Sequence, residues 1–487
     1  MSEEILINVT PQETRVAVVE NGVLQEILIE RKRRRGIAGN IYKGRVNRVL
    51  PGMQAAFVDI GLERAAFLHV ADIDQSERRE AGEDATDDIT GLLREGDDVI
   101  VQAVKDPLGT KGARLTTHLS IPSRYTVLML GNPTAGVSAK IGDAAERDRL
   151  KALLQETIAD NGGQVGFIVR TAAEKVGEEA LRRDMAFLGK LWRVVRDAAR
   201  AAAAPACVHE DLPLALRTLR DFGGGLEKVR IDSRETHGRV RDFVEQFCME
   251  MLPRIEHYPG ERPLFDLYGV EDEIQRALDR RVQLKSGGYL ILDQTEAMTT
   301  IDVNTGGYVG RRNLEETIFK TNLEAAQAIA RQLRLRNLGG IIIIDFIDMT
   351  QEEHKQQVLR ALEKALEKDH ARTQVCEVSS LGLVEMTRKR TRESLEHVLC
   401  ESCPTCGGRG TLRTVETACY EIYREILREA RQFDADSLLV VAAQAIVDRM
   451  LDEESDSVAD LEAFIGKPIR FQTETRYNQE QFDVVLM

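Results

Sequence analysis

The sequence predicts a multidomain α+β protein, and three observations support this fold class. The chain has 487 residues, which is more than one ordinary hydrophobic core accommodates. Short, evenly spaced β-runs separated by turn residues fill 36–120 and indicate a small barrel. Strands alternate with helices over 278–399, as in an α/β sheet domain.

The composition, 43% hydrophobic and 30% charged, is typical of a soluble globular protein. The N-terminus lacks the basic and then apolar order of a signal peptide, and no apolar stretch approaches the ~20 residues of a spanning helix. We therefore expect a cytoplasmic protein without a membrane segment. The net charge of −14 does not exclude a nucleic-acid partner, because basic residues are concentrated in 31–35 and 388–392.

The first half of the chain predicts strands EILINV, TRVAVVE and VLQEILIE within 4–30. Asn21-Gly22 favours a two-residue hairpin, because both turn positions need positive φ. After the barrel, YTVLML and QVGFIVR are expected strands, and 178–200 is an expected long helix. Further helices are expected near 211–222, 236–251 and 271–284.

In the second half, YLILDQ and AMTTIDVN predict a hairpin and IIIID predicts a buried strand. Helices are expected at about 313–336 and 352–369. A cysteine-rich segment at 400–406 precedes an α/β tail that begins at 415.

Two aspartates and one amide lie near strand ends in this region. Asp302 and Asn304 share one face of a strand, and Asp345 ends a strand too apolar to be anything but central. Ligands of open α/β sheets gather at the carboxyl ends of strands, so these oxygens match a Mg²⁺ site that could activate water against a phosphodiester. Alternatively, the aspartates cap helices or pair with nearby arginines, and spacing does not rank Asp345 against Asp348.

Cys400, Cys403 and Cys406 have the CxxC spacing that places two thiolates on one tetrahedral zinc ion. A structural zinc site needs four ligands, and the chain has no separate CxxC pair. Cys400, His397 or another residue could complete the set, or two chains could contribute one pair each. The alternative is a tight turn with reduced cysteines and no metal.

Phe57, Phe67 and His69 lie on or beside short β-runs near basic residues of the expected barrel. Aromatic side chains among basic groups are how OB folds hold single strands, although the two phenylalanines could equally be core residues.

Arg170-Thr171 follows the strand QVGFIV, and Thr171 with Glu174 three residues later predicts a capping box at a helix start. A helix N-terminus beside an arginine is also an anion site.

Three strings, LKSGGYLILDQTEAMTTIDVNTG, RQLRLRNLGGIIIIDFIDM and GLVEMTRKRTRESLEHVLC, resemble the catalytic core of the ribonuclease E/G family. The resemblance runs from ILINVTPQETRVA to YNQEQFDVV and thus covers essentially the whole chain. It implies a Mg²⁺-dependent endoribonuclease that cuts single-stranded, AU-rich RNA, prefers 5′-monophosphorylated substrates and leaves 5′-phosphate and 3′-hydroxyl ends. The implied roles are rRNA 5′-end maturation and mRNA decay.

The resemblance also assigns the metals. It makes Asp302 and Asp345 the Mg²⁺ ligands and Asn304 the adjacent catalytic residue. It makes Cys403 and Cys406 ligands of a structural Zn²⁺ shared between two subunits. This zinc-link implies a homodimer and leaves open whether dimers pair into tetramers.

For RNA, GNIYKGRVNRVLPGMQAAFVDIG resembles the S-one type RNA-binding domain of the family. The implied RNA contacts are Phe57, Phe67 and Lys111. The implied 5′-phosphate sensor consists of Arg170 and Thr171 with Val127 nearby, and Ser123 stands where another family member has a glycine.

The resemblance completes the expected domain organisation. It comprises a split RNase H-like scaffold (1–34 and 212–277), an inserted OB-fold barrel (35–121), a 5′-end sensor (122–211), a DNase I-like catalytic domain (278–399), a zinc-link (400–414) and a small C-terminal α/β domain (415–487).

Two other functions fit the same residues: a non-catalytic RNA-binding scaffold, and a metal-dependent phosphatase or DNase on the same fold. A binding module would have no need of oxygen ligands at a buried strand exit, so a requirement for magnesium would discriminate against it.

Overall fold

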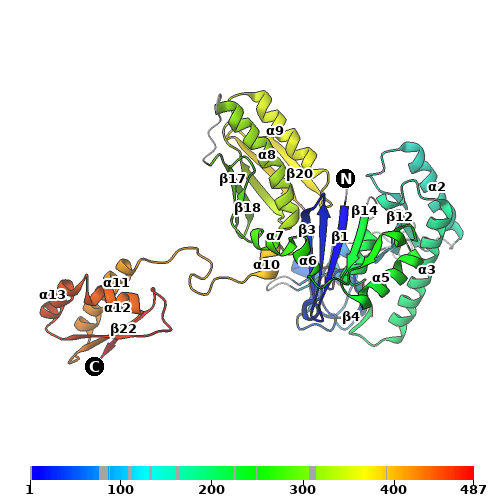
Figure 1. Cartoon of the computed structure of the whole chain (residues 1–487). Coiled ribbons are helices and arrows are strands. Elements are labelled where there is room, and N and C mark those ends of the chain that lie inside the picture. The colour runs from blue at the N-terminus through cyan, green and yellow to red at the C-terminus, as the bar shows by residue number, and fades with distance from the viewer. Residues whose placement is uncertain are drawn as a thin grey trace. The chain divides into compact units, whose positions relative to one another are not determined.

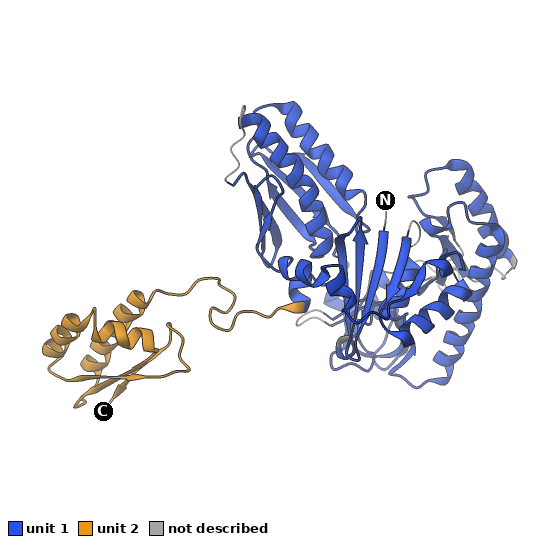
Figure 2. Ribbon diagram, in the orientation of Figure 1, with its two compact units in different colours: residues 1–398 blue, residues 399–487 orange. Residues whose placement is uncertain are grey.

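A computed structural model of the chain divides into two compact units, residues 1–398 and residues 399–487 (Figure 2). The structure describes residues 3–75, 86, 88–107, 112–130, 134–160, 165–222, 226–247, 249–306, 314–390 and 392–487.

A five-stranded sheet joins the N-terminal segment to a much later part of the chain. Its strands are β1 (Glu3–Val9), β2 (Glu13–Glu20), β3 (Val23–Arg31), β14 (Leu226–Ile231) and β15 (Ile255–His257), in the order β15-β14-β1-β2-β3. The turn between β2 and β3 has φ 50° at Asn21 and φ 76° at Gly22, which confirms the predicted hairpin. β1 pairs in parallel with β14, so this sheet contains strands from both segments expected to form the split scaffold.

Helices of the second segment pack against this sheet (Figure 1). They are α4 (Leu214–Asp221), α5 (Arg234–Phe247), the short helix η6 (Met249–Arg254), α6 (Leu264–Leu267) and α7 (Val270–Arg276). The helix expected over 271–284 is therefore wrong in its second half, because α7 ends at Arg276 and a strand follows.

The expected barrel is present and is closed by five strands. They are β4 (Ile41–Leu50), β5 (Ala55–Asp59), β6 (Ala66–His69), β7 (Asp98–Lys105) and β8 (Arg114–Thr116). The sheet runs β4-β5-β6-β8-β7, and an additional pairing of β4 with β7 closes it. A sixth strand, β13 (Ala206–His209), adds to the outer side of β4.

A four-stranded sheet follows the barrel in sequence. Its strands are β9 (Ser120–Pro122), β10 (Thr126–Leu130), β11 (Ala135–Val137) and β12 (Val165–Val169), and its helices are α2 (Ala144–Asp160) and α3 (Glu178–Ala201). The expected strands and the long helix are confirmed, whereas α2 was not foreseen.

The last sheet of the first unit has six strands in the order β16-β17-β18-β19-β21-β20. They are β16 (Arg281–Gln283), β17 (Tyr289–Gln294), β18 (Met298–Asn304), β19 (Gly340–Asp345), β20 (Thr373–Val378) and β21 (Leu383–Arg388). Helices α8 (Leu314–Leu335) and α9 (Glu352–Leu366) lie side by side on one face of this sheet (Figure 1). A short helix, α10 (Leu395–Leu399), follows the sheet.

Alternation along the strands gives this sheet two different faces. Leu290, Leu292, Ile301 and Val303 are buried in one core with residues of α8 and α9. Their neighbours in sequence point the other way and keep partial solvent exposure. We call this second surface the open face.

The second unit contains a three-stranded sheet in the order β23-β22-β24. Its elements are α11 (Val415–Gln432), β22 (Leu438–Ala442), α12 (Gln444–Leu451), α13 (Ser455–Ile465), β23 (Ile469–Thr473) and β24 (Phe482–Leu486). The expected α/β tail is thus confirmed.

A buried ion pair links β21 to the loop after α9. Arg388 contacts Asp369 at 2.6 Å, with 5% and 1% of the two side chains exposed. We expect Asp369→Ala to lower the free energy of unfolding by about 3–5 kcal/mol, because Arg388 would keep a buried charge without its partner. Urea unfolding followed by circular dichroism measures this change.

The matched control is Glu235→Ala, which removes an exposed pair with Arg239. That change should lower stability by less than about 1 kcal/mol. Equal effects of the two substitutions would contradict the role of the buried pair.

Candidate active site

Asp302 and Asp345 are neighbours on the open face. Asp302 lies near the end of β18 and Asp345 ends the adjacent parallel strand β19, and the two residues are paired in register. Adjacent strands lie about 4.8 Å apart, so the two carboxylates reach the same space. Asn304 lies on the same face, and its Nδ2 donates a hydrogen bond to Asp302 Oδ2 at 2.7 Å. The structure therefore brings together the three residues that the sequence singled out.

The electrostatics of this site are unfavourable without a cation. Partial burial raises the pKa of the Asp345 carboxyl, and the negative charges of Asp302 and then Asp348 raise it further. Asp348 thus lies close enough to add to the repulsion. A divalent cation between these carboxylates would relieve it, so the charge distribution fits a Mg²⁺ site.

The donor set also fits this ion. Among the described residues, no three His, Cys, Asp or Glu side chains gather closely enough to enclose a metal. Mg²⁺ keeps several waters and is commonly held by one or two carboxylates together with substrate phosphate. Asp302 and Asp345 would hold it in that way.

Helix α8 anchors the backbone on both sides of the carboxylates. The buried amide of Asn322 donates to the Ile347 carbonyl at 2.8 Å and accepts from the Ile347 N–H at 3.1 Å, which fixes the segment between Asp345 and Asp348. The Glu324 carboxylate accepts from the N–H of Ser286 at 3.1 Å and so holds the turn before β17.

That turn needs glycine at Gly288. A Cβ built there would lie 2.6 Å from the Asn304 carbonyl oxygen, which is closer than real Cβ atoms approach. The SGG motif therefore lets the turn pack against the end of β18 and position Asn304. Sequence patterns did not reveal these supporting contacts, since they join distant segments.

The barrel presents aromatic side chains to its surface. Phe57 and Phe67 are register partners on β5 and β6, and their rings meet edge to face with centroids 6.1 Å apart. Both are half-buried, whereas their neighbours in sequence form the barrel core. The alternative that they are core residues is therefore wrong. Arg48 pairs in register with Phe57, and Arg114 with Phe67, so basic groups flank the two rings.

Lys111, the third expected RNA contact, lies outside the described residues. Among the described residues, the basic side chains paired in register with the two rings are Arg48 and Arg114.

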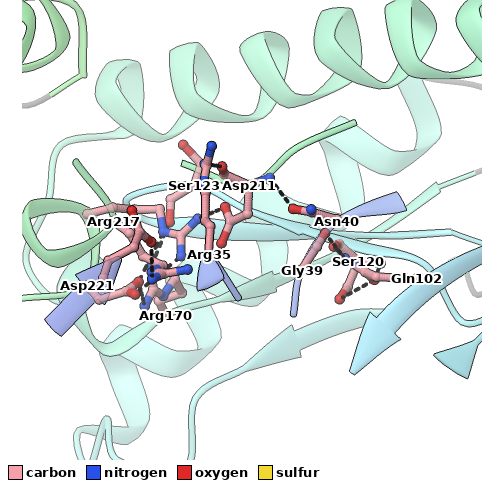
Figure 3. Close-up of polar contacts among 12 residues, drawn as sticks. Arg35, Gly39, Asn40, Gln102, Ser120, Ser123, Arg170, Asp211, Arg217 and Asp221 are labelled. Atoms are coloured by element: carbon pink, nitrogen blue, oxygen red, sulfur yellow. Dashed lines mark hydrogen bonds and ion pairs between the residues drawn. The ribbon is translucent and has the colours of Figure 1, made fainter. Parts of the chain in front are cut away.

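Arg170 follows β12 and is held by two partners (Figure 3). Its guanidinium donates to the Ser123 carbonyl at 2.8 Å and to Asp221 Oδ1 at 2.8 Å. The Asp221 carboxyl is also paired with Arg220, and the two arginines hold its pKa low against the opposing effect of burial. Sequence reasoning gave Asp221 no role, because it lies far from Arg170 along the chain.

The capping box expected at Thr171 is wrong. Residues Thr171–Ala173 form a short 3₁₀ turn, and α3 begins only at Glu178. The Thr171 hydroxyl lies 3.0 Å from the Ser138 hydroxyl. Without a long helix at this point, the anion-binding argument rests on Arg170 itself and not on a helix N-terminus.

Ser123 and Val127 do not line the cleft that contains Arg170. Ser123 is buried, and its hydroxyl donates to Asp184 at 2.6 Å, so only its carbonyl reaches Arg170. Val127 is half-buried on β10. Arg170 and Thr171, but neither of these two, line a cleft of about 1530 Å³ in the first unit.

In the second unit, Cys403 and Cys406 lie on one tight turn. Backbone N–H groups of Cys406 and Thr405 lower the pKa of the Cys403 thiol, which favours the thiolate that binds metal. His397, a further candidate ligand, belongs to the first unit, where its Nδ1 lies 3.4 Å from the Ser394 hydroxyl.

Comparison with known proteins decides the family. The model of the Ribonuclease E/G family matches residues 120–391. The chain belongs to the ribonuclease E/G family. A second model of that family, its thioredoxin-like domain, matches residues 402–486 and describes the second unit.

Relatives in the family agree with this assignment. Ribonuclease G of Escherichia coli (strain K12) is 58% identical over 492 residues, which cover 100% of each chain. Ribonuclease G of Haemophilus influenzae is 55% identical over 99% of each chain. Ribonuclease E of E. coli (strain K12) is 38% identical over 94% of this chain but only 44% of its own length. The similarity read from the motifs is thus confirmed, and it is greater to ribonuclease G than to ribonuclease E.

None of the helices in the described part of the chain combines the length and apolar character that a bilayer span requires.

We expect Mg²⁺ to raise the unfolding temperature of the wild-type chain, because an ion that binds only the folded state stabilises it. Asp302→Asn and Asp345→Asn should abolish this increase. In the absence of metal, Asp345→Asn should be at least as stable as the wild type, because the substitution removes the repulsion from Asp302. Differential scanning fluorimetry measures each of these effects.

Asp293→Asn is the matched control, since Asp293 lies on the same sheet but is paired with Arg280 at 2.6 Å. It should retain the response to Mg²⁺. An equal response in all four proteins would show that the ion binds elsewhere.

Proposed function

We propose that this chain is a Mg²⁺-dependent enzyme that cuts single-stranded RNA at the open face of its catalytic sheet. The observation that carries the proposal is the in-register pair of Asp302 and Asp345 at the ends of neighbouring strands. The chain is an endoribonuclease, as its membership of a ribonuclease family indicates. The metal, the substrate preference and the residue roles are the proposal.

The chain's own residues prepare the reaction. Asn304 orients the Asp302 carboxylate through its hydrogen bond, and Asp345 supplies the second carboxylate beside it. Mg²⁺, when bound, supplies positive charge that polarises the phosphodiester and activates water. The water oxygen bonds to phosphorus, the bond from phosphorus to the 3′ oxygen breaks, and a water proton ends on that oxygen. The products carry a 5′-phosphate and a 3′-hydroxyl.

The barrel surface would hold the single strand. Bases can stack on Phe57 and Phe67, while Arg48 neutralises phosphate, as in other proteins that bind single strands without reading sequence. Arg114 is partly neutralised by Asp72 at 2.8 Å, so its contribution should be smaller. The expected contact from Lys111 remains part of this proposal.

Arg170 would recognise a 5′-monophosphate. Its guanidinium is already oriented by Ser123 and Asp221, and a planar guanidinium matches phosphate oxygens. Thr171 lines the same cleft and offers a hydroxyl. Val127 would contribute an apolar neighbour, since it pairs in register with Ile168, which lines the cleft. An incoming phosphate would have to share or replace the Asp221 contact.

The wider biology follows from the family resemblance. We infer activity in the cytoplasm on AU-rich single-stranded RNA, in rRNA 5′-end maturation and mRNA decay. We also infer a homodimer in which Cys403 and Cys406 of two chains share one Zn²⁺, so that each chain contributes half of a four-ligand site. Whether dimers pair into tetramers is a question for mass measurement in solution.

A cleavage assay tests the catalytic proposal. We expect Asp302→Asn and Asp345→Asn to slow RNA cleavage on the order of 10³-fold, because each removes a carboxylate that holds the cation whose positive charge stabilises the transition state. RNA binding should be largely intact, and Asp293→Asn should cut at the wild-type rate. Addition of a chelator should stop the wild-type enzyme.

The same assay separates the rival functions. A non-catalytic scaffold would bind RNA and leave it whole with or without Mg²⁺. A phosphatase would release phosphate without shortening the strand, and a DNase would cut matched DNA in preference to RNA. Normal cleavage by the Asp302→Asn, Asp345→Asn double variant would show that the site is wrong.

The sensor is tested by comparing RNA with a 5′-monophosphate and the same RNA with a 5′-hydroxyl. Arg170→Gln should reduce the preference for the monophosphate by about tenfold, because it removes charge-assisted hydrogen bonds. Arg182→Gln is the control, since that arginine pairs with Glu156 and Glu178 on exposed helix surface. An unchanged preference in the Arg170 variant would contradict the proposal that Arg170 recognises the 5′-monophosphate.

A further inference from the structure

A positively charged side chain on the open face has no role in the function proposed so far. Arg281, on the edge strand β16, stacks over the ring of Tyr289 on β17, with its guanidinium carbon 3.8 Å from the ring centroid. Val282, between Arg281 and Gln283, packs toward the core, so Arg281 and Gln283 point to the open face.

The Arg281 side chain is held in place from two directions. The Tyr289 ring supports one face of the guanidinium, as is common for arginine. The Gln283 amide lies beside the guanidinium, and in the amide orientation that satisfies both residues its oxygen accepts from Nε at 2.9 Å and from a terminal nitrogen at 3.3 Å. An arginine carries five N–H donors, so others remain free to bind an anion.

Arg281 differs from most arginines of this sheet in its ion pairing. In the described part of the chain, no carboxylate lies within ion-pair distance of Arg281, whose side chain is exposed. Its sequence neighbour Arg280 differs, since it pairs with both oxygens of Asp293. Two adjacent arginines at one sheet edge are therefore distinguished by whether a carboxylate neutralises them.

The sheet register places Arg281 beside the catalytic carboxylates. Arg281 is the partner of Ile291, Ile291 is the partner of Asp302, and Asp302 is the partner of Asp345. Arg281 is thus two strand spacings, about 10 Å, from Asp302 along a row that crosses the open face. In the next row, Tyr289 is the register partner of Asn304.

A polyanionic strand approaching this acidic centre needs compensating positive charge. Asp302, Asp345 and Asp348 repel phosphates, and a cation bound between them would neutralise only part of that charge. We propose that Arg281, held on Tyr289, binds the RNA phosphate next to the one that is cut and so holds the strand across the catalytic site. The inference rests on the proposed ribonuclease function and deepens it, because it assigns a phosphate contact to the open face itself.

The salt dependence of RNA binding tests this assignment. With the full-length chain and a single-stranded RNA in EDTA, the slope of log K against log [KCl] should fall in magnitude by about 0.7 in Arg281→Gln, the value for one lost phosphate contact on a single strand. The dissociation constant should rise about three- to tenfold at moderate salt. Fluorescence anisotropy measures both.

Three variants provide the controls. Arg281→Lys keeps the charge and should keep the slope. Tyr289→Phe keeps the ring and should also leave it unchanged. Arg280→Gln removes an arginine that is already neutralised, so its slope should equal that of the wild type.

An unchanged slope in Arg281→Gln would overturn the inference, and so would an equal decrease in Arg280→Gln or in Arg281→Lys. Failure of the ribonuclease proposal would look different, because the wild-type chain would then leave RNA uncut in Mg²⁺ whatever the slopes are.

Discussion

Two like charges held on neighbouring strands are the constraint around which the catalytic sheet is built. Asp302 and Asp345 are in register, and Asp348 adds a third negative charge nearby. In a fold without a ligand this arrangement only costs stability, since each carboxylate disfavours ionisation of the next. A divalent cation shared between the two carboxylates would offset this repulsion, and this is the basis of the proposed Mg²⁺ site.

Other parts of the first unit hold the two carboxylates in position and place positive charge near them. Helix α8 covers one face of the sheet and anchors the loops beside the carboxylates through Asn322 and Glu324. On the open face the positive charge is local, at Arg281 beside the site. Similar local groups occur elsewhere in the unit, at Arg48 on the barrel and at Arg170 in the cleft. A net charge of −14 is therefore compatible with an RNA partner, because the cationic groups occur at particular surfaces.

The sequence predicted those features that depend on local periodicity. The apolar run before Asp345 and the alternation around Asp302 were sufficient to place both residues at strand ends, and Asn21-Gly22 was sufficient for the first hairpin. Features that depend on long-range pairing were missed. Arg281 was assigned to a helix because the three residues of β16 directly follow a helical pattern and are a strand only through pairing with β17. The prediction of a capping box at Thr171 was also wrong. The local pattern of Thr171 and Glu174 is typical of a helix start, but the chain forms only a short 3₁₀ turn there and α3 begins at Glu178.

The central claim is that Asp302 and Asp345 jointly bind one divalent cation. Crystals of the wild-type chain soaked in Mn²⁺, which scatters anomalously and stands in for Mg²⁺, test it most directly. The account predicts one ion on the open face, about 2.1 Å from a carboxylate oxygen of each aspartate, with water in the remaining positions. An ion bound to neither aspartate, or to one while the other turns away, would contradict it.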